Sequence, residues 1–271
     1  MTAPDVAREL HKAIHSFDAS SLYSQLLAPW VTAHPEVRGW LLSFAARPGL
    51  PVPTATPEEL WELYALSRVS QTLLLRIQSG RPDGTDWPGP SLTLSEYSAF
   101  FTSLGFTEVG DAQFAPFHHE IVAVEQAADD AIAIRVQDVF WPGLMLGDLM
   151  FSRAGVWVTG GRKWVEKTVA ESSTLYWAYQ RKSRPCRDES HGWGSNSQWR
   201  TSFRRDYLIK DQVHFNADAE LDPFTPEGGD LLTPAERIEL LTNRCFIATT
   251  KPHDDCYPYD LRHTAALSDR V

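Results

Sequence analysis

A Phe-His-His-Glu run at residues 117–120 opens a stretch of strand-forming residues. Imidazole and carboxylate groups together bind transition metals. Because side chains alternate along a strand, His118 and Glu120 share one face, and His119 shares the other with Glu125. We predict a divalent transition metal, Fe or Zn, held by ligands drawn from a wider set: His118, His119, Glu125, His191 and His214. The alternative is that these histidines lie on the surface or are satisfied by hydrogen bonds.

A loop rich in arginine and tryptophan is predicted from Arg184 to Asp206, where neither helical nor alternating periodicity survives. Its aromatic residues must leave water, so we expect an ordered, packed loop. Arginine offers a planar fork to carboxylate or phosphate. The residues predicted to bind substrate are Arg187, Trp193, Asn196, Trp199, Arg200 and Arg204. Alternatively, the arginines pair with the acidic residues of the same segment, Asp188, Glu189 and Asp206.

The distribution of charge supports an anionic ligand. The chain carries a formal charge of -10, which disfavours nucleic acids and anionic membranes as partners. Residues 162–210 nevertheless contain 11 Lys and Arg against 5 Asp and Glu, a local charge of +6. Such a segment can focus an anion into one place. The alternative is that these charges line the exposed face of a strand.

The three cysteines indicate a reducing compartment, because a small odd number does not build a disulfide framework. We therefore expect a cytoplasmic protein, and the N-terminal residues lack the apolar region of a secretory signal. No membrane span is expected either. Cys186 is a minor candidate nucleophile, since neighbouring cations lower a thiol pKa. A zinc site is an open alternative for the C-terminal residues Cys245, His253, Cys256 and His263, although their spacing is poor.

The elements that must position these residues fall into three regions. Residues 1–110 are predicted to be helical, with Thr56 and the Thr93–Glu96 capping box marking helix starts. Residues 111–216 are predicted to form short strands, including 119–124, 131–136, a hairpin through Gly160 and Gly161, and 213–215. Residues 163–179 could form either a helix or strands. Residues 217–271 comprise a linker, a helix that begins at the Thr233–Glu236 capping box, and a tail.

These patterns together predict an α+β protein, in which a helical N-terminal half packs on an antiparallel sheet or open barrel and a short C-terminal helix follows. We expect a metal-assisted enzyme, hydrolytic or oxidative, that acts on a small carboxylate or phosphate, with Glu120 and His191 as catalytic residues. One alternative is a non-catalytic interaction protein that uses the Trp/Arg loop. Another is a protein that binds a small ligand without metal.

Overall fold

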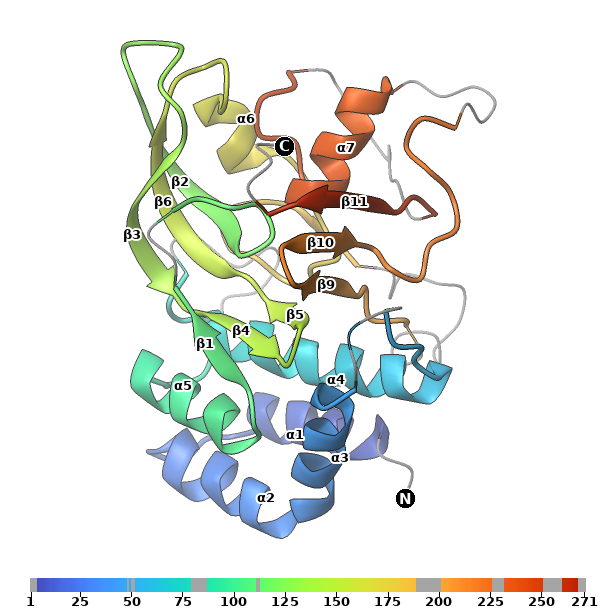
Figure 1. Ribbon diagram of the computed structural model, residues 1–271. Helices are drawn as coiled ribbons and strands as arrows, with labels where there is room; N and C mark the ends of the chain where they lie inside the picture. Colours follow the sequence, from blue (N-terminus) through green and yellow to red (C-terminus); the bar gives the residue numbers. More distant parts are fainter. Residues whose placement is uncertain are drawn as a thin grey trace.

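The computed structural model describes residues 4–47, 49, 52–78, 87–110, 113–188, 201–225, 232–250 and 260–267. It is an α+β structure: a helical N-terminal part, β-sheets in the middle of the chain and a short C-terminal helix (Figure 1). The helices are α1 (Pro4–His15), the π-helical turn η1 (Tyr23–Leu27), α2 (Ala28–Ala33), α3 (Pro35–Ala45), α4 (Pro57–Leu74), α5 (Leu94–Ser103), α6 (Lys167–Ser172) and α7 (Pro234–Asn243).

Three helices begin at capping boxes, as the sequence predicts for Thr93 and Thr233. In each box the threonine side chain accepts from the third helical N–H, and the glutamate at that position accepts from the threonine N–H. The third box starts α4, where Thr56 pairs with Glu59 in this way. α4 is the helix that matters most for the site, because it is buried along almost its whole length from Leu60 onward.

The larger sheet has six strands in the order β1-β4-β5-β9-β10-β11, and every neighbouring pair is antiparallel. The smaller sheet has the order β2-β6-β3, and β7 pairs with β8 separately. The strands are β1 (Thr107–Val109), β2 (His119–Gln126), β3 (Arg135–Trp141), β4 (Gly143–Leu146), β5 (Leu149–Ser152), β6 (Ala154–Gly160), β7 (Leu175–Tyr176), β8 (Cys186–Arg187), β9 (Asp206–Ile209), β10 (Gln212–Phe215) and β11 (His263–Ala266).

Two local expectations need correction. The hairpin through Gly160 and Gly161 does not form, because β6 already has a neighbour on each side and a returning strand would have no edge to pair with. β2 is one of these neighbours, and it runs parallel to β6. Residues 163–179 instead contain both the short helix α6 and the strand β7. The predicted strand at 131–136 begins only at Arg135.

One hydrophobic core joins the helical part to the six-stranded sheet. It runs from Val6 and Leu10 on α1, through Leu63 and Leu66 on α4, to strand residues such as Phe151. β11 adds the C-terminal part of the chain to the edge of the same sheet, beside β10. The helices therefore pack directly against the sheet that carries the site described below.

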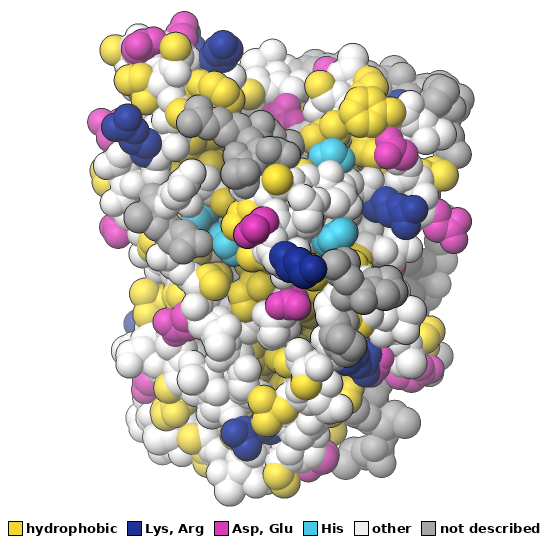
Figure 2. Space-filling view, viewed as in Figure 1, with side chains coloured by type: hydrophobic (Ala, Val, Ile, Leu, Met, Phe, Trp, Pro, Cys, Tyr) yellow, Lys and Arg dark blue, Asp and Glu magenta, His cyan; other side chains and the backbone are white. Residues whose placement is uncertain are grey.

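Within the described part of the chain, no helix is long and apolar enough to cross a membrane. On the face shown in Figure 2, the lysine and arginine side chains are scattered among acidic and neutral ones and form no continuous basic patch. Several arginines of the basic segment are instead buried, namely Arg181, Arg184, Arg204 and Arg205. Part of the charge of this segment is therefore directed into the molecule.

Candidate anion-binding site

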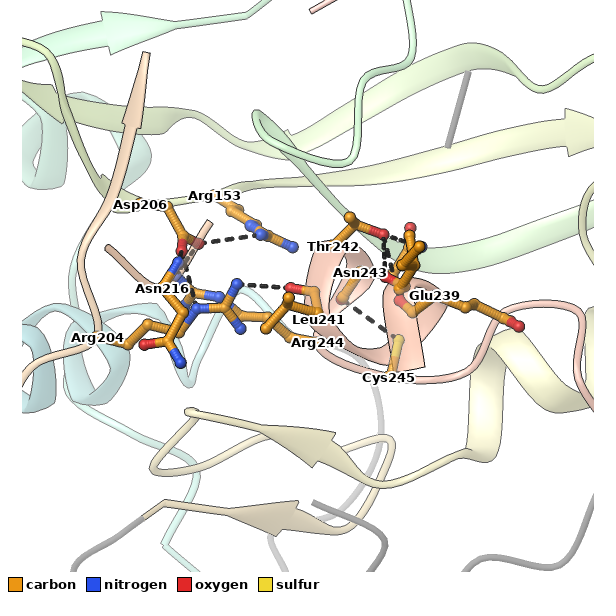
Figure 3. A network of polar contacts seen from close by, with 11 residues as sticks. Arg153, Arg204, Asp206, Asn216, Glu239, Leu241, Thr242, Asn243, Arg244 and Cys245 are labelled. Carbon is orange, nitrogen blue, oxygen red and sulfur yellow. Dashed lines mark hydrogen bonds and ion pairs between the residues drawn. The ribbon is translucent and has the colours of Figure 1, made fainter. Parts of the chain in front are cut away.

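Asp206, the first residue of β9, is the centre of a buried ion-pair network (Figure 3). Its carboxylate is fully buried and faces three guanidinium groups. Arg204 Nε lies 2.8 Å from Oδ1, whereas Arg244 Nη2 and Arg153 Nη2 lie 2.9 and 3.3 Å from Oδ2. The backbone N–H of Asn216 donates to Oδ1 at 2.8 Å. One negative charge is thus shared by three positive charges.

Arg153 reaches this network from the single-residue link between β5 and β6, where the chain passes from one sheet to the other. Trp141 Nε1 donates to the backbone carbonyl of Arg153 at 3.0 Å. The Trp141 ring also packs on Gly155 so closely that a Cβ at that position would overlap it. The backbone on both sides of Arg153 is therefore held by packing and by a hydrogen bond, and its side chain is buried.

The other two arginines come from the ends of other elements. Arg204 lies two residues before the start of β9 at Asp206, and its guanidinium stacks on the ring of Trp177, 4.0 Å from the ring centroid. Arg244 ends α7 with a left-handed backbone, φ 61°. Trp177 also has a positive φ, of 52°. Positive φ is a strained conformation for bulky side chains, and such strain concentrates at functional sites.

The guanidinium of Arg153 is only partly satisfied. Arg153 is only 5% exposed. Within the described chain, its Nε and Nη1 have no hydrogen-bond acceptor, and neither does Nε of Arg244. Burial and the charges of Arg244 and Arg204 lower the pKa of Arg153 well below its usual value. Burial alone raises the pKa of Asp206, but the three arginines outweigh it and the pKa lies well below its usual range. The network has surplus positive charge and spare donors.

A second buried pair lies beside the first. Arg181 donates from Nε and Nη2 to the two oxygens of Glu120, at 2.8 and 2.7 Å, and from Nη1 to Gln71 at 3.0 Å. Burial raises the pKa of Glu120, but Arg181 reverses this effect and the net pKa is lowered. Glu120, predicted as a catalytic residue, is therefore held ionised against an arginine. A carboxylate held in this way is a weak base.

Two adjoining cavities open beside these pairs. The first, of about 30 Å³, is bounded by Arg153, Arg244, Glu120 and Arg181, and the second, of about 40 Å³, lies beside Arg204. The first lies where α4, the two sheets and the end of α7 meet, and the second lies between α4, β5 and the end of α7. The residues common to both cavities are Ser67, Gln71, Phe151, Trp177 and Arg244.

The predicted metal ligands do not converge among the described residues, where no group of three His, Cys, Asp or Glu side chains is placed to hold an ion. His118 and His119 are buried neighbours, and His119 Nδ1 accepts from the backbone N–H of Ala115 at 3.0 Å. Glu125 needs correction as a partner for His119. The two lie six residues apart on β2, roughly 20 Å along a strand. His214 lies on β10, in the other sheet, 3.2 Å from Thr264 Oγ1.

The predicted substrate-binding residues are only partly described. Arg204 is in the network, but Arg187 lies exposed on β8. The other predicted positions lie outside the described residues: His191, Trp193, Asn196, Trp199 and Arg200. The same is true of His253 and Cys256 in the suggested zinc set. The expectation that the Arg184–Asp206 loop is ordered therefore stays a prediction for its central part.

Of the two described thiols, Cys245 is buried and Cys186 is partly buried, which disfavours reactivity. Burial raises the pKa of Cys186 to about 12, opposite to the lowering expected from its cationic neighbours. Burial likewise raises the pKa of Cys245, whose sulfur lies 3.4 Å from Nη1 of Arg184. Neither thiol is therefore supported as a nucleophile.

Sequence reasoning missed Arg153 and Arg244. Arg153 had a signal, because it is the single charge in the otherwise apolar or small run from Leu149 to Val158, and a charge inside such a run is either paired or functional. Arg244 had none, since an arginine after a helix is commonly a solvated end charge.

Comparison of the chain with protein-family models, with curated proteins and with solved structures gave no match. The function must therefore be argued from the site itself.

Proposed function

We propose that this protein binds a small anionic molecule in the cavities beside Asp206, with Arg153, Arg204 and Arg244 as the recognising residues. The observation that carries this proposal is Arg153: a buried guanidinium that borders a cavity and has two nitrogen atoms without an acceptor among the described residues. An unsatisfied buried donor costs about 1–3 kcal/mol, and more if it is charged. An anion in the cavity would supply the acceptors and offset the excess positive charge.

The arrangement around Arg153 would be hard to explain as a device for stability. Buried ion pairs contribute little net stability, because desolvation offsets the attraction, and hydrophobic replacements are often neutral or stabilising. Here three guanidinium groups share one carboxylate, so the balance is worse than in a simple pair. Ligand binding gives the surplus arginines a role that stability does not.

The test is to measure anion binding and melting temperature for the wild type and for Arg153→Met. Inorganic sulfate, inorganic phosphate and acetate serve as probes, with binding followed by calorimetry and by the rise in melting temperature. We expect at least one anion to bind the wild type and to bind Arg153→Met at least tenfold more weakly, since a hydrogen bond to a charged group contributes about 1.5–3 kcal/mol. The melting temperature of ligand-free Arg153→Met should be unchanged or higher.

Arg237→Met is the matched control. Arg237 is also buried, but it donates to the backbone carbonyls of Pro223 and Thr225, away from the cavities. This variant should lose stability and keep its anion affinity. The proposal fails if no probe binds the wild type, or if Arg153→Met binds as tightly as the wild type does.

The metal-assisted reaction has less support. Among the described residues His118 and His119 are the only predicted ligands that adjoin each other, and a site built on them would need His191, which lies outside the described residues. Elemental analysis of protein purified without a metal-affinity tag tests that proposal independently. Stoichiometric iron or zinc that is lost in His119→Ala would restore it.

A further inference from the structure

The charged groups around the cavities leave a definite surplus. Besides Asp206 and its three arginines, the groups to be counted are the Glu120–Arg181 pair, Arg184 and Asp188. Arg184 is buried near Cys245 and lies close enough to Glu120 to act on its pKa. Asp188 borders the second cavity and accepts from the hydroxyl of Tyr64 at 2.7 Å. Among the described residues, five guanidinium groups thus lie at the cavities or next to the groups that line them, against three carboxylates, which leaves two positive charges.

The neutral groups at the cavities are mostly engaged with the protein. The Ser67 hydroxyl donates to the Tyr64 carbonyl at 2.7 Å, and Ser70 shares a hydrogen bond with Tyr97 at 2.8 Å. Gln71 uses its side-chain oxygen for Arg181 and for the backbone N–H of Tyr179. Arginine N–H groups are therefore the charged donors that the described lining residues offer to a ligand.

The size of the cavities limits the group that binds. About 10–15 Å³ of such space is needed per water molecule, so cavities of about 30 and 40 Å³ together hold a group of roughly five heavy atoms. Among the described arginines that line the cavities, Arg153 in the β5–β6 link and Arg244 at the end of α7 have donors without an acceptor. A compact oxyanion with oxygens in several directions can meet both, whereas a planar carboxylate presents its two oxygens in one plane.

Resting on the proposed function, we infer that the bound group is a compact divalent oxyanion, either free or as the phosphoryl group of a phosphate monoester. Its two negative charges match the two surplus positive charges. A monoanion such as a carboxylate would leave one buried charge uncompensated, and an uncompensated buried charge is strongly unfavourable.

The experiment compares anions of different charge on the wild-type protein by calorimetry. Sulfate and glycerol phosphate are the divalent probes, and acetate and nitrate are the monovalent ones. We expect the divalent probes to bind at least tenfold more tightly than the monovalent ones. Glycerol phosphate should bind roughly tenfold more tightly at pH 7.5 than at pH 5, because its second pKa is about 6.

Sulfate is the internal control, since it stays divalent and should bind equally at both pH values. The lowered pKa values of Asp206 and Glu120 keep both carboxylates ionised over this range. Tighter binding of glycerol phosphate than of sulfate at pH 7.5 would indicate a monoester, and the reverse a free oxyanion. Either order supports the inference.

Arg244→Gln tests the charge argument directly, because it lowers the surplus from two charges to one. The preference for divalent over monovalent probes should fall at least fivefold in this variant and remain in Arg237→Gln. If acetate binds the wild type as tightly as sulfate does, with no effect of pH on glycerol phosphate, this inference is overturned while the proposed function stands. If none of the probes binds, both fail.

Discussion

Asp206 connects residues that lie far apart in the chain. Its Oδ1 accepts from Arg204 and from the backbone N–H of Asn216, and its Oδ2 accepts from Arg153 and Arg244. The side chain adds no apolar surface to the core, so its burial is favourable only because every lone pair direction has a donor. Its charge state therefore affects the whole site.

We predict that Asp206 gives the protein a specific sensitivity to acid. The folded-state pKa is lowered, so the unfolded state binds protons first as the pH falls below the usual aspartate value of about 4. The stabilisation is complete above that value and is lost progressively below it. Asp206→Asn should flatten the dependence of the unfolding free energy on pH below about pH 4, and should destabilise the protein at pH 7 by about 3–5 kcal/mol. Urea unfolding at a series of pH values measures both effects.

Asp130→Asn is the matched control, because Asp130 is exposed. It should leave both the stability at pH 7 and the acid dependence close to those of the wild type. If Asp206→Asn behaves in the same way, the ion-pair network does not hold the carboxylate as described.

At the level of elements, backbone strain gathers around the site. The described non-glycine residues with positive φ are Trp177, Lys210, Asn216 and Arg244. Lys210 serves the tight turn between β9 and β10, whereas the other three border the cavities or contact Asp206. Asparagine tolerates this conformation, but tryptophan and arginine are unusual in it. The α7 terminus therefore places Arg244 where helices usually have glycine.

We predict that two substitutions of Arg244 differ in their effect on stability but not in their effect on anion binding. Arg244→Gly removes the guanidinium and relieves the backbone, whereas Arg244→Ala removes the guanidinium and keeps a left-handed backbone that costs about 1 kcal/mol. The glycine variant should thus be more stable than the alanine variant by about 1 kcal/mol in urea unfolding. Both variants should weaken sulfate binding to a similar extent. Equal stability of the two variants would contradict a strained Arg244 backbone.

At the level of the whole molecule, the cavities lie at a junction between the helical part, the sheets and the C-terminal helix. α4 enters from the helical part, the β5–β6 link joins the two sheets, and Arg204 and Arg244 connect β9 and α7 to the same place. Figure 1 shows α4 along the side of the sheets nearer the N-terminal helices and α7 on the opposite side. A ligand here would add a further link between segments that already meet through the ion pairs of Asp206.

We predict that anion binding slows hydrogen exchange at this junction more than elsewhere. At a sulfate concentration 100 times the dissociation constant, binding stabilises the bound state by about 2.7 kcal/mol. Amides of β9 and α7 that exchange by opening of the cavities should therefore exchange up to about 100-fold more slowly. Mass spectrometry of exchanged peptides measures this change.

Peptides from α3 are the internal control, because this helix lies among the N-terminal helices and does not border the cavities. Local opening there should be unaffected by sulfate. In Arg153→Met the protection of β9 and α7 should disappear. Protection spread evenly over the chain in that variant would show that sulfate acts on the protein without occupying the site.

Local signals in the sequence were sufficient for the helix starts that have capping boxes. Thr93 and Thr233 form the predicted capping boxes, and a tight turn at Lys210 and Asp211 joins β9 to β10. These features depend on residues within four positions of one another, so their physical causes are contained in short stretches of sequence. The α+β class follows from the same local patterns.

The pairing of strands could not be obtained in this way. The β2–β6 pair joins residues such as His119 and Ala154, and no local preference distinguishes this parallel partner from an antiparallel one. The hairpin expected through Gly160 failed because β3 and β2 already occupy both edges of β6. Only the complete sheet decides which edges are available.

By itself, the sequence determined the fold class, the helix caps and the presence of more arginine than acid in one segment. The tertiary structure decided which arginines share a site. It brings Arg153 and Arg244 to Arg204 and Asp206, and it separates His119 from Glu125 along β2. The physical reason is that the interaction between charged groups depends on their distance and burial in three dimensions. Sequence spacing reports only neighbours along the chain.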